Sequence, residues 1–344
     1  MIRPGPRNLI TDVDGIAVGN AEDRPGRSGV TVVLPAGRTL AAADIRGGAP
    51  GTRETDALRP GTLVKAVDAI VLSGGSAFGL EAAGSVMAWL ADRGRGYRLG
   101  AATVPIVPAA ILFDLNNGGD KPWMRAGSGL APPYHALGAA AVAAAAPDFA
   151  LGNAGAGLGA TAGPYEGGLG SASVVDAATG LTVGALMAAN PLGTPVIPGQ
   201  DGLWAWMLEL DGELGGQPLP TAAPPPGIEV ALPELPGTNT IIGVVATDAD
   251  LDTGEALRLA AMAHDGLARA VKPSHTPLDG DCIFVLATAA RRLPAPRPQA
   301  LARLGGMAAD ATTRAVARGV FLAEPLGDRP TYRTRHGHAL RGAG

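Results

Sequence analysis

The chain has 344 residues, of which 47% are hydrophobic and 17% charged, and its formal net charge is −4. This length suits one large or two medium globular domains, and a single domain over residues 1–344 is the simpler expectation. The small negative charge and an aromatic content of 4% give no basis for binding nucleic acid or an anionic membrane surface. Small molecules or short peptides are the expected partners.

The single cysteine, Cys282, excludes an internal disulfide framework and fits a reducing cytoplasm. Because it opens an apolar run, a buried structural thiol is favoured over a nucleophile. The first seven residues lack the apolar core of a signal peptide, and the longest weakly hydrophobic run, residues 136–146, is too short to span a bilayer. A cytoplasmic protein without a membrane segment is therefore expected.

Turn-forming residues divide the first part of the chain into short apolar runs. Residues 8–20 predict a pair of strands turning at Asp14 and Gly15, and residues 29–34 predict a further strand. Residues 46–56 form a glycine-rich loop with two arginines and two acidic side chains. Such a loop either cradles a ligand with backbone amides or simply turns tightly, and the sequence does not separate these alternatives.

An apolar run at residues 67–73 leads through a Gly-Gly-Ser turn into helical spacing at residues 80–90. A strand, a glycine turn and a helix are compatible with an anion site at the helix N-terminus, although close packing of strand on helix explains the glycines equally well. The turn lacks the Lys-Ser/Thr ending of a phosphate loop and does not match the dinucleotide spacing.

An alanine-rich helix is predicted over residues 134–146, followed by the most glycine-dense loop of the chain, residues 152–173. Residues 171–175 and 181–187 predict a hairpin around Thr179 and Gly180. Because no helix follows the glycine-dense loop, the context argues against a Rossmann fold. Later in the chain, an amphipathic helix, a strand and a last helix are predicted over residues 253–271, 282–287 and 299–320, and the basic tail from Tyr332 is expected to be mobile.

Thr240 stands where a proline-rich, exposed connection, residues 212–237, meets an apolar strand, residues 241–246. A hydroxyl residue at that position is able to attack the carbonyl before it through an N-to-O acyl shift and cut the chain. The new terminus then combines a hydroxyl nucleophile with its own α-amine as base. From these residues alone an ordinary turn before a strand remains the alternative.

Asp279 and Asp281 bracket Gly280 at the entrance to the next strand. Two carboxylates there would manage protons near a nucleophile, and the same triplet is also ordinary turn chemistry. His275 is a candidate base close by. It has no second His or Cys at ligand spacing, so neither a metal nor another cofactor is expected.

Eight motifs in order resemble the self-processing aminopeptidases and amidases, a family that includes the L-aminopeptidase/D-amidase-esterases, the β-peptidyl aminopeptidases and the nylon-oligomer hydrolases. The resemblance covers about residues 8–325. The motifs are at residues 8–13, 46–56, 72–80, 155–157, 167–173, 190–191, 239–242 and 275–281.

The resemblance implies an αββα sandwich of the N-terminal-nucleophile hydrolase kind. It implies autocleavage between Asn239 and Thr240 into an alpha chain, residues 1–239, and a beta chain, residues 240–344. Thr240 would be nucleophile and base, Asn190 would donate to the oxyanion, and Asp279 and Asp281 would hold the Thr240 amine. Homotetramers of the cleaved pair are usual in the family.

Two residues depart from the family pattern. Glu166 stands near the position of a lysine, and a glutamate there would raise rather than depress the pKa of the Thr240 amine. Phe113 stands where the nylon-oligomer hydrolases carry a tyrosine, which removes a hydroxyl donor. We expect both residues to bear on substrate binding, with Glu166 either paired with an arginine or contacting the free amine of the substrate.

The sequence therefore predicts a hydrolase acting on short peptides, amino-acid amides or esters, or synthetic amide oligomers through an acyl-Thr240 intermediate. One alternative is acyl transfer to an amine, as in the self-cleaving ornithine acetyltransferases. The other is a non-catalytic relative that binds amines.

Overall fold

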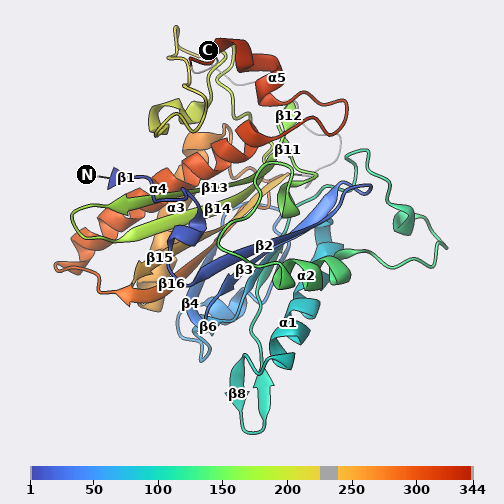
Figure 1. The fold of residues 1–344 in the computed structure, drawn as a ribbon, viewed down its shortest axis with the longest axis vertical. Helices are drawn as coiled ribbons and strands as arrows, with labels where there is room; N and C mark the ends of the chain where they lie inside the picture. The colour runs from blue at the N-terminus through green and yellow to red at the C-terminus, as the bar shows by residue number, and fades with distance from the viewer. Residues whose placement is uncertain (1, 225–238, 342–344) are drawn as a thin grey trace.

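The computed structural model describes residues 2–224 and 239–341 (Figure 1). The α-helices of these residues are α1 (Ala82–Asp92), α2 (Tyr134–Ala143), α3 (Thr253–Ala270), α4 (Arg297–Leu322) and α5 (Tyr332–His336). Short 3-10 helices include η1 (Ile10–Asp12) and η3 (Ser76–Glu81).

Most strands belong to two sheets. In the seven-stranded sheet the order is β1 (Ile2–Arg3), β13 (Gly168–Asp176), β14 (Thr182–Asn190), β15 (Thr240–Ala249), β16 (Cys282–Arg291), β4 (Thr39–Ile45) and β6 (Ala66–Val67). In the five-stranded sheet it is β2 (Ile16–Asp23), β3 (Ser28–Pro35), β7 (Ile70–Ser73), β10 (Ala109–Ile111) and β5 (Thr52–Arg53). Two small ladders pair β8 (Tyr97–Leu99) with β9 (Ala102–Val104), and β11 (Thr161–Ala162) with β12 (Tyr165–Glu166).

The two sheets lie between two pairs of helices. Helices α3 and α4 pack on the seven-stranded sheet, α4 across β13 and β14 and α3 against β4 and β16. Helix α2 covers β2 and β3, with α1 beside it (Figure 1). The resulting order of layers, helix, sheet, sheet, helix, is the αββα sandwich that the sequence predicted.

Side chains of β15 alternate between two buried layers, because successive residues of a strand point to opposite faces. Ile241 and Val245 belong to the core against α3 and α4, whereas Ile242 and Val244 belong to the core between the sheets. All four are fully buried, and burying each stabilises the fold by about 1.5–3 kcal/mol. By the same alternation Thr240 points into the layer between the sheets.

Glycines of the segment 167–170 allow α4 to lie directly on β13. A Cβ added at Gly170 would lie 1.9 Å from the carbonyl oxygen of Ala315 in α4. Real Cβ atoms do not approach a backbone this closely, so this glycine serves helix-on-sheet packing.

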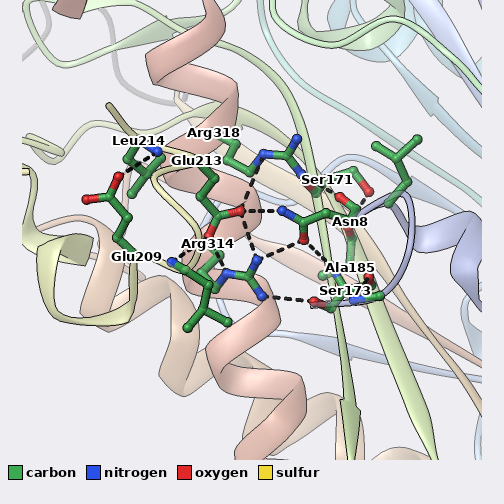
Figure 2. A network of polar contacts seen from close by, with 12 residues as sticks. Asn8, Ser171, Ser173, Ala185, Glu209, Glu213, Leu214, Arg314 and Arg318 are labelled. Carbon is green, nitrogen blue, oxygen red and sulfur yellow. Dashed lines mark hydrogen bonds and ion pairs between the residues drawn. The ribbon is translucent and has the colours of Figure 1, made fainter. Parts of the chain in front are cut away.

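A buried polar network links α4 to the N-terminal segment (Figure 2). Arg314 is 1% exposed, and its guanidinium donates to the Glu213 carboxylate and to Asn8 Oδ1. Arg318, one turn later, donates to the backbone carbonyls of Asn8 and Ser171. Two cations of α4 thereby hold the start of the chain and the segment around Glu213 against the seven-stranded sheet.

Three expectations at the ends of elements were wrong. Residues 10–12 form the 3-10 helix η1 rather than a strand, because the Asp12 carboxylate accepts the backbone N–H groups of Arg7 and Leu9 and closes a turn. The run 67–73 divides between the two sheets as β6 and β7. The tail is anchored rather than mobile, since Tyr332 is fully buried and donates to the carbonyl oxygen of Asp201 at 2.7 Å.

The proline-rich connection is described only as far as residue 224, and its remainder lies outside the described residues. Leu214 and Gln217 at its beginning are buried, which an exposed connection would not show. The Gln217 side chain accepts from the backbone N–H of Leu203 at 2.8 Å, and Leu219 beyond it is 54% exposed. The exposed character therefore begins after Gln217.

Candidate active site

Thr240 begins β15 and is 4% exposed. Its side-chain oxygen donates to the carbonyl oxygen of Asn239, the residue before it. The same carbonyl oxygen accepts the backbone N–H of Gly280 at 3.0 Å. The carbonyl of the Asn239–Thr240 peptide bond is therefore polarised by two donors, one of which is the hydroxyl next to it.

Gly280 packs closely against this peptide bond. A Cβ added there would lie 2.8 Å from Thr240 Oγ1 and 2.7 Å from the carbonyl oxygen of Ala49. The absence of a side chain at position 280 is what lets its N–H approach the Asn239 carbonyl.

Asp279 is 1% exposed and is held by hydrogen bonds on both oxygens. Oδ1 accepts the N–H of Leu192 at 3.1 Å, and Oδ2 accepts the N–H and the hydroxyl of Thr276 at 3.1 and 2.5 Å. Burial and, secondarily, the neighbouring Asp281 raise the pKa of Asp279. It therefore retains its proton to higher pH than an exposed aspartate.

Asp281 is equally buried and lies next to the strand that Thr240 begins. Its Oδ1 accepts the N–H of Ile241 at 2.8 Å, and its Oδ2 lies 2.7 Å from His275 Nδ1. The Asp281 carboxylate thus holds the backbone amide of Ile241, the residue that follows Thr240.

The glycine-rich loop at residues 46–49 holds the backbone of Asp279 and Asp281 by hydrogen bonds. The N–H groups of Arg46 and Gly47 donate to the Asp281 carbonyl at 2.9 and 3.3 Å, and that of Ala49 donates to the Asp279 carbonyl at 2.8 Å. Because these amides are used within the protein, residues 46–49 support residues 279–281 and do not offer these N–H groups to a ligand.

Asn190 ends β14 and stands directly opposite Thr240 in the sheet. It is 1% exposed, and its Oδ1 accepts the N–H of Thr161 at 2.8 Å. Its Nδ2 donates to the carbonyl oxygen of Phe113 at 3.3 Å. The amide is thereby oriented with its oxygen toward β11 and its donor end toward the segment after β10.

Glu166 of β12 is paired directly with Thr161 of β11, so their side chains share one face of this small ladder. The Thr161 hydroxyl on that face reaches Asn190 Oδ1 at 3.3 Å. Burial raises the pKa of Glu166, against the opposing effect of Arg329 and Arg27. Within the described residues neither arginine comes within ion-pair distance of its carboxylate, and none donates a hydrogen bond to it. Among the described residues, Glu166 therefore does not form the ion pair with an arginine that was one of the two expectations.

His264 belongs to this neighbourhood and was missed from sequence. The ring of His264, on α3, meets that of His275 edge to face with centroids 4.8 Å apart, and its Nε2 lies 3.0 Å from the carbonyl oxygen of Asp44. Burial lowers the pKa of His264 to about 4, so it is neutral at physiological pH. The available signal was a polar residue on the otherwise apolar face of that helix.

Other candidates from the sequence do not join the site. The N–H groups of Gly74 and Ser76 donate to the carbonyls of Gly29 and Leu112, so the turn before α1 is used in packing rather than offered to an anion. Cys282 is fully buried, and burial raises the pKa of its thiol.

Two findings concern the described residues as a whole. They contain no cluster of three or more His, Cys, Asp or Glu side chains arranged to hold a metal ion. No helix among them combines the length and the apolar character needed to cross a bilayer.

The sequence model of peptidase family S58 matches residues 8–333. An uncharacterized aminopeptidase of Mycobacterium bovis is 44% identical over 351 aligned positions, covering 95% of this chain and 97% of that protein. A 6-aminohexanoate-oligomer endohydrolase of Kocuria sp. is 30% identical over 294 positions, covering 83% of this chain and 76% of that protein.

Solved structures agree on the fold. A β-aminopeptidase from Burkholderia sp. superposes with a TM-score of 0.72 at 25% identity, covering 100% of this chain and 96% of that one. The L-aminopeptidase D-Ala-esterase/amidase of Ochrobactrum anthropi, described as a variant of the Ntn hydrolase fold, gives 0.69 at 22% identity, covering 98% and 96% of the two chains. With the match over residues 8–333, these likenesses show that the chain belongs to peptidase family S58 and has the fold of the N-terminal-nucleophile hydrolases.

Proposed function

We propose that the chain is a self-processing aminopeptidase and amidase whose nucleophile is Thr240. The observation that carries this proposal is the contact of the Thr240 hydroxyl with the Asn239 carbonyl, to which Gly280 donates a second hydrogen bond. A hydroxyl next to a carbonyl that already has a backbone donor is the starting arrangement for an N-to-O acyl shift.

In the processing reaction, Thr240 Oγ1 attacks the carbonyl carbon of Asn239, and the hydroxyl proton passes to the departing amide nitrogen. The resulting ester joins Asn239 to the Thr240 side chain. Water hydrolyses this ester, which leaves a carboxylate on Asn239 and a free α-amine on Thr240. The Gly280 N–H stabilises the oxyanion of the first step, and the products are residues 1–239 and 240–344.

In the hydrolytic reaction, the new α-amine accepts the hydroxyl proton as Oγ1 attacks a substrate carbonyl. The unperturbed pKa of such an amine, about 8, suits a base near neutral pH. Asn190 donates to the oxyanion of the tetrahedral intermediate that precedes acyl-Thr240. Asp279 and Asp281, on either side of Gly280, orient the ammonium form, which gives its proton to the leaving amine as the C–N bond breaks. Water then hydrolyses the acyl-Thr240 ester and releases the acid.

Substrates of the proposed reaction are short peptides, amino-acid amides and esters, and amide oligomers with a free amine. The names of two relatives, an aminopeptidase and a 6-aminohexanoate-oligomer endohydrolase, support this class. Glu166, a buried carboxylate on the ladder face next to Asn190, is proposed to bind the amine of the substrate. Phe113 is half-buried and is proposed to offer its ring as apolar surface beside the acyl group.

The role of Glu166 is tested with paired substrates. In Glu166→Gln we expect KM for an amino-acid amide to rise about tenfold or more, because a charge-assisted hydrogen bond contributes about 1.5–3 kcal/mol. The N-acetylated amide, which lacks the ammonium, serves as the matched control and is expected to be cleaved equally by both proteins. Equal changes for both substrates would contradict amine recognition.

The nucleophile is tested by denaturing intact-mass spectrometry of the wild type, Thr240→Ser and Thr240→Ala. We expect fragments that divide at Asn239 and Thr240 in the first two proteins and a single full-length chain in the third. An activated ester should then acylate the fragment that begins at residue 240. A full-length wild type, or cleavage of Thr240→Ala at this bond, would overturn the proposal.

A further inference from the structure

His275 forms a close pair with Asp281 that the proposed mechanism has not used. Its Nδ1 lies 2.7 Å from Asp281 Oδ2, and its backbone N–H donates to the same oxygen at 3.1 Å. The other oxygen, Oδ1, accepts the N–H of Ile241 at 2.8 Å. One carboxylate therefore joins an imidazole to the amide that follows Thr240.

The direction of this contact follows from its chemistry. A carboxylate oxygen only accepts, so Nδ1 of His275 carries the hydrogen. The Asp281 side chain is 2% exposed and that of His275 is 20% exposed. The imidazole therefore separates a buried carboxylate from water while supplying one of its hydrogen bonds.

The groups that face His275 come from several elements. On its own loop these are Asp281 and, beyond it, Asp279, and from α3 the His264 ring packs against it. Behind His264, the carboxylate of Asp44 lies 3.9 Å from His264 Nε2 and is paired with Arg46 at 2.7 Å. Because His264 is neutral, its ring places no charge beside His275, and the edge-to-face contact restricts the orientation of the His275 ring.

The backbone of His275 is also specialised. Its φ of +56° lies in the left-handed region, which histidine, asparagine and glycine adopt more readily than other residues. This conformation turns the N–H and the imidazole of one residue toward the same carboxylate oxygen.

We propose that His275 is a positioning residue, whose Nδ1–H holds the Asp281 carboxylate against the Ile241 amide and thereby fixes Thr240 for attack. The inference rests on the proposed function for its kinetic consequence, but the hydrogen-bonding arrangement itself does not. It predicts that the donor at position 275, rather than histidine as such, is what the first step of processing requires.

Two substitutions separate the donor from the backbone conformation. His275→Asn keeps a side-chain N–H close to the position of Nδ1 and tolerates a positive φ. His275→Gly tolerates the same φ and keeps the backbone N–H but has no side-chain donor. We expect His275→Asn to process at close to the wild-type rate and His275→Gly to be at least about tenfold slower, in a time course of intact mass during cell-free synthesis, where each chain begins uncut.

A second readout does not depend on catalysis. In Thr240→Ala chains, hydrogen–deuterium exchange of the Ile241 amide reports its bond to Asp281. We expect the Asn variant to match the histidine chain and the Gly variant to exchange about tenfold faster. Equal protection and processing in the Gly and Asn variants would overturn the role of His275. An uncut wild type with the expected exchange pattern would overturn the proposed function and leave the positioning role standing.

Discussion

At the scale of single residues, Gly280 leaves no room for a side chain beside Thr240. A methyl group at position 280 would lie within 3 Å of both Thr240 Oγ1 and the Ala49 carbonyl oxygen, and the backbone of Ala49 leaves it little room to move. In Gly280→Ala we expect self-processing to slow by about 100-fold or more, because the N–H that polarises the Asn239 carbonyl is displaced. The fraction of full-length chain after purification measures this.

Gly306 of α4 provides the matched control. Nothing lies within 4 Å of a Cβ added there, and alanine favours a helix over glycine by about 1 kcal/mol. Gly306→Ala is therefore expected to process normally with unchanged or raised stability. Normal processing by Gly280→Ala would remove Gly280 from the mechanism.

Asp114, the residue after Phe113, predicts a pH dependence of stability. It is 2% exposed, and its Oδ1 accepts the N–H of Gly75 at 2.8 Å, whereas Oδ2 has no partner among the described residues. Burial raises the pKa of Asp114 from 3.8 to about 6, against Ser28, Gly75 and Lys121, which lower it. The folded state therefore favours the protonated form.

The sign follows from the raised pKa. The protonated Asp114 carboxyl group stabilises the folded state fully below pH 3.8. This contribution to the free energy of unfolding is lost as the pH rises through about 6, and it totals about 3 kcal/mol. Relative to Asp114→Asn, which does not titrate, the wild-type free energy of unfolding should fall by most of this amount between pH 4 and 7. Urea unfolding in a Thr240→Ala background measures it, with exposed Asp92→Asn as the surface control. A difference that is constant with pH would contradict the prediction.

At the scale of elements, α4 depends on the pairing of Arg314 with Glu213 shown in Figure 2. In Arg314→Met, Glu213 would remain buried without its main cation, which costs about 3–5 kcal/mol of unfolding free energy. Arg269→Met of α3 is the control, since Arg269 and Asp310 are 49% and 39% exposed and such a pair contributes about 0–1 kcal/mol. Denaturant unfolding compares the two, and similar losses would contradict the buried network.

Elements with strong local signals were predicted correctly from sequence. The apolar stripe of α3 and the β-branched run that became β15 each have a periodicity that a single segment reveals. The hairpin of β13 and β14 was also found, although it is longer than predicted. The tail at Tyr332 was not, because its partner Asp201 is distant in sequence. Residues 10–12 were also missed, although the contacts of Asp12 with Arg7 and Leu9 that close their turn are local.

Within the site, sequence motifs identified the residues but not their contacts. Thr240, Asn190, Asp279 and Asp281 lie together as the resemblance implied, and their catalytic roles remain predictions. The hydrogen bonds from residues 46–49 and the pairing of His275 with His264 depend on β4 and α3 meeting beside β16, which no local pattern contains. Polar contacts between distant segments are set by topology, and one sequence does not reveal them.

At the scale of the whole molecule, the proposed cut would leave the seven-stranded sheet built from two fragments, with the strands of the second between strands of the first. Strands β15 and β16 follow Thr240, yet they lie between β14 and β4, which precede it. The fragment 240–344 is therefore held by a ladder on each side, and α4 adds the Arg314 network. We expect the two fragments to co-elute on gel filtration under native conditions and to separate only in denaturant. Separation in buffer alone would contradict this.

The central position of β15 and β16 also bears on how the protein is made. Thr240 meets Gly280 and Asn190 only after strands from both ends of the chain have joined one sheet, so under the proposed mechanism the chain folds before it is cut. The first folding is unimolecular and independent of concentration. Once the bond is cut, any later refolding becomes an encounter of two molecules, whose yield depends on protein concentration. Under the proposed mechanism, each chain therefore folds only once as a single molecule. After the cut, the native state forms again only when two fragments associate.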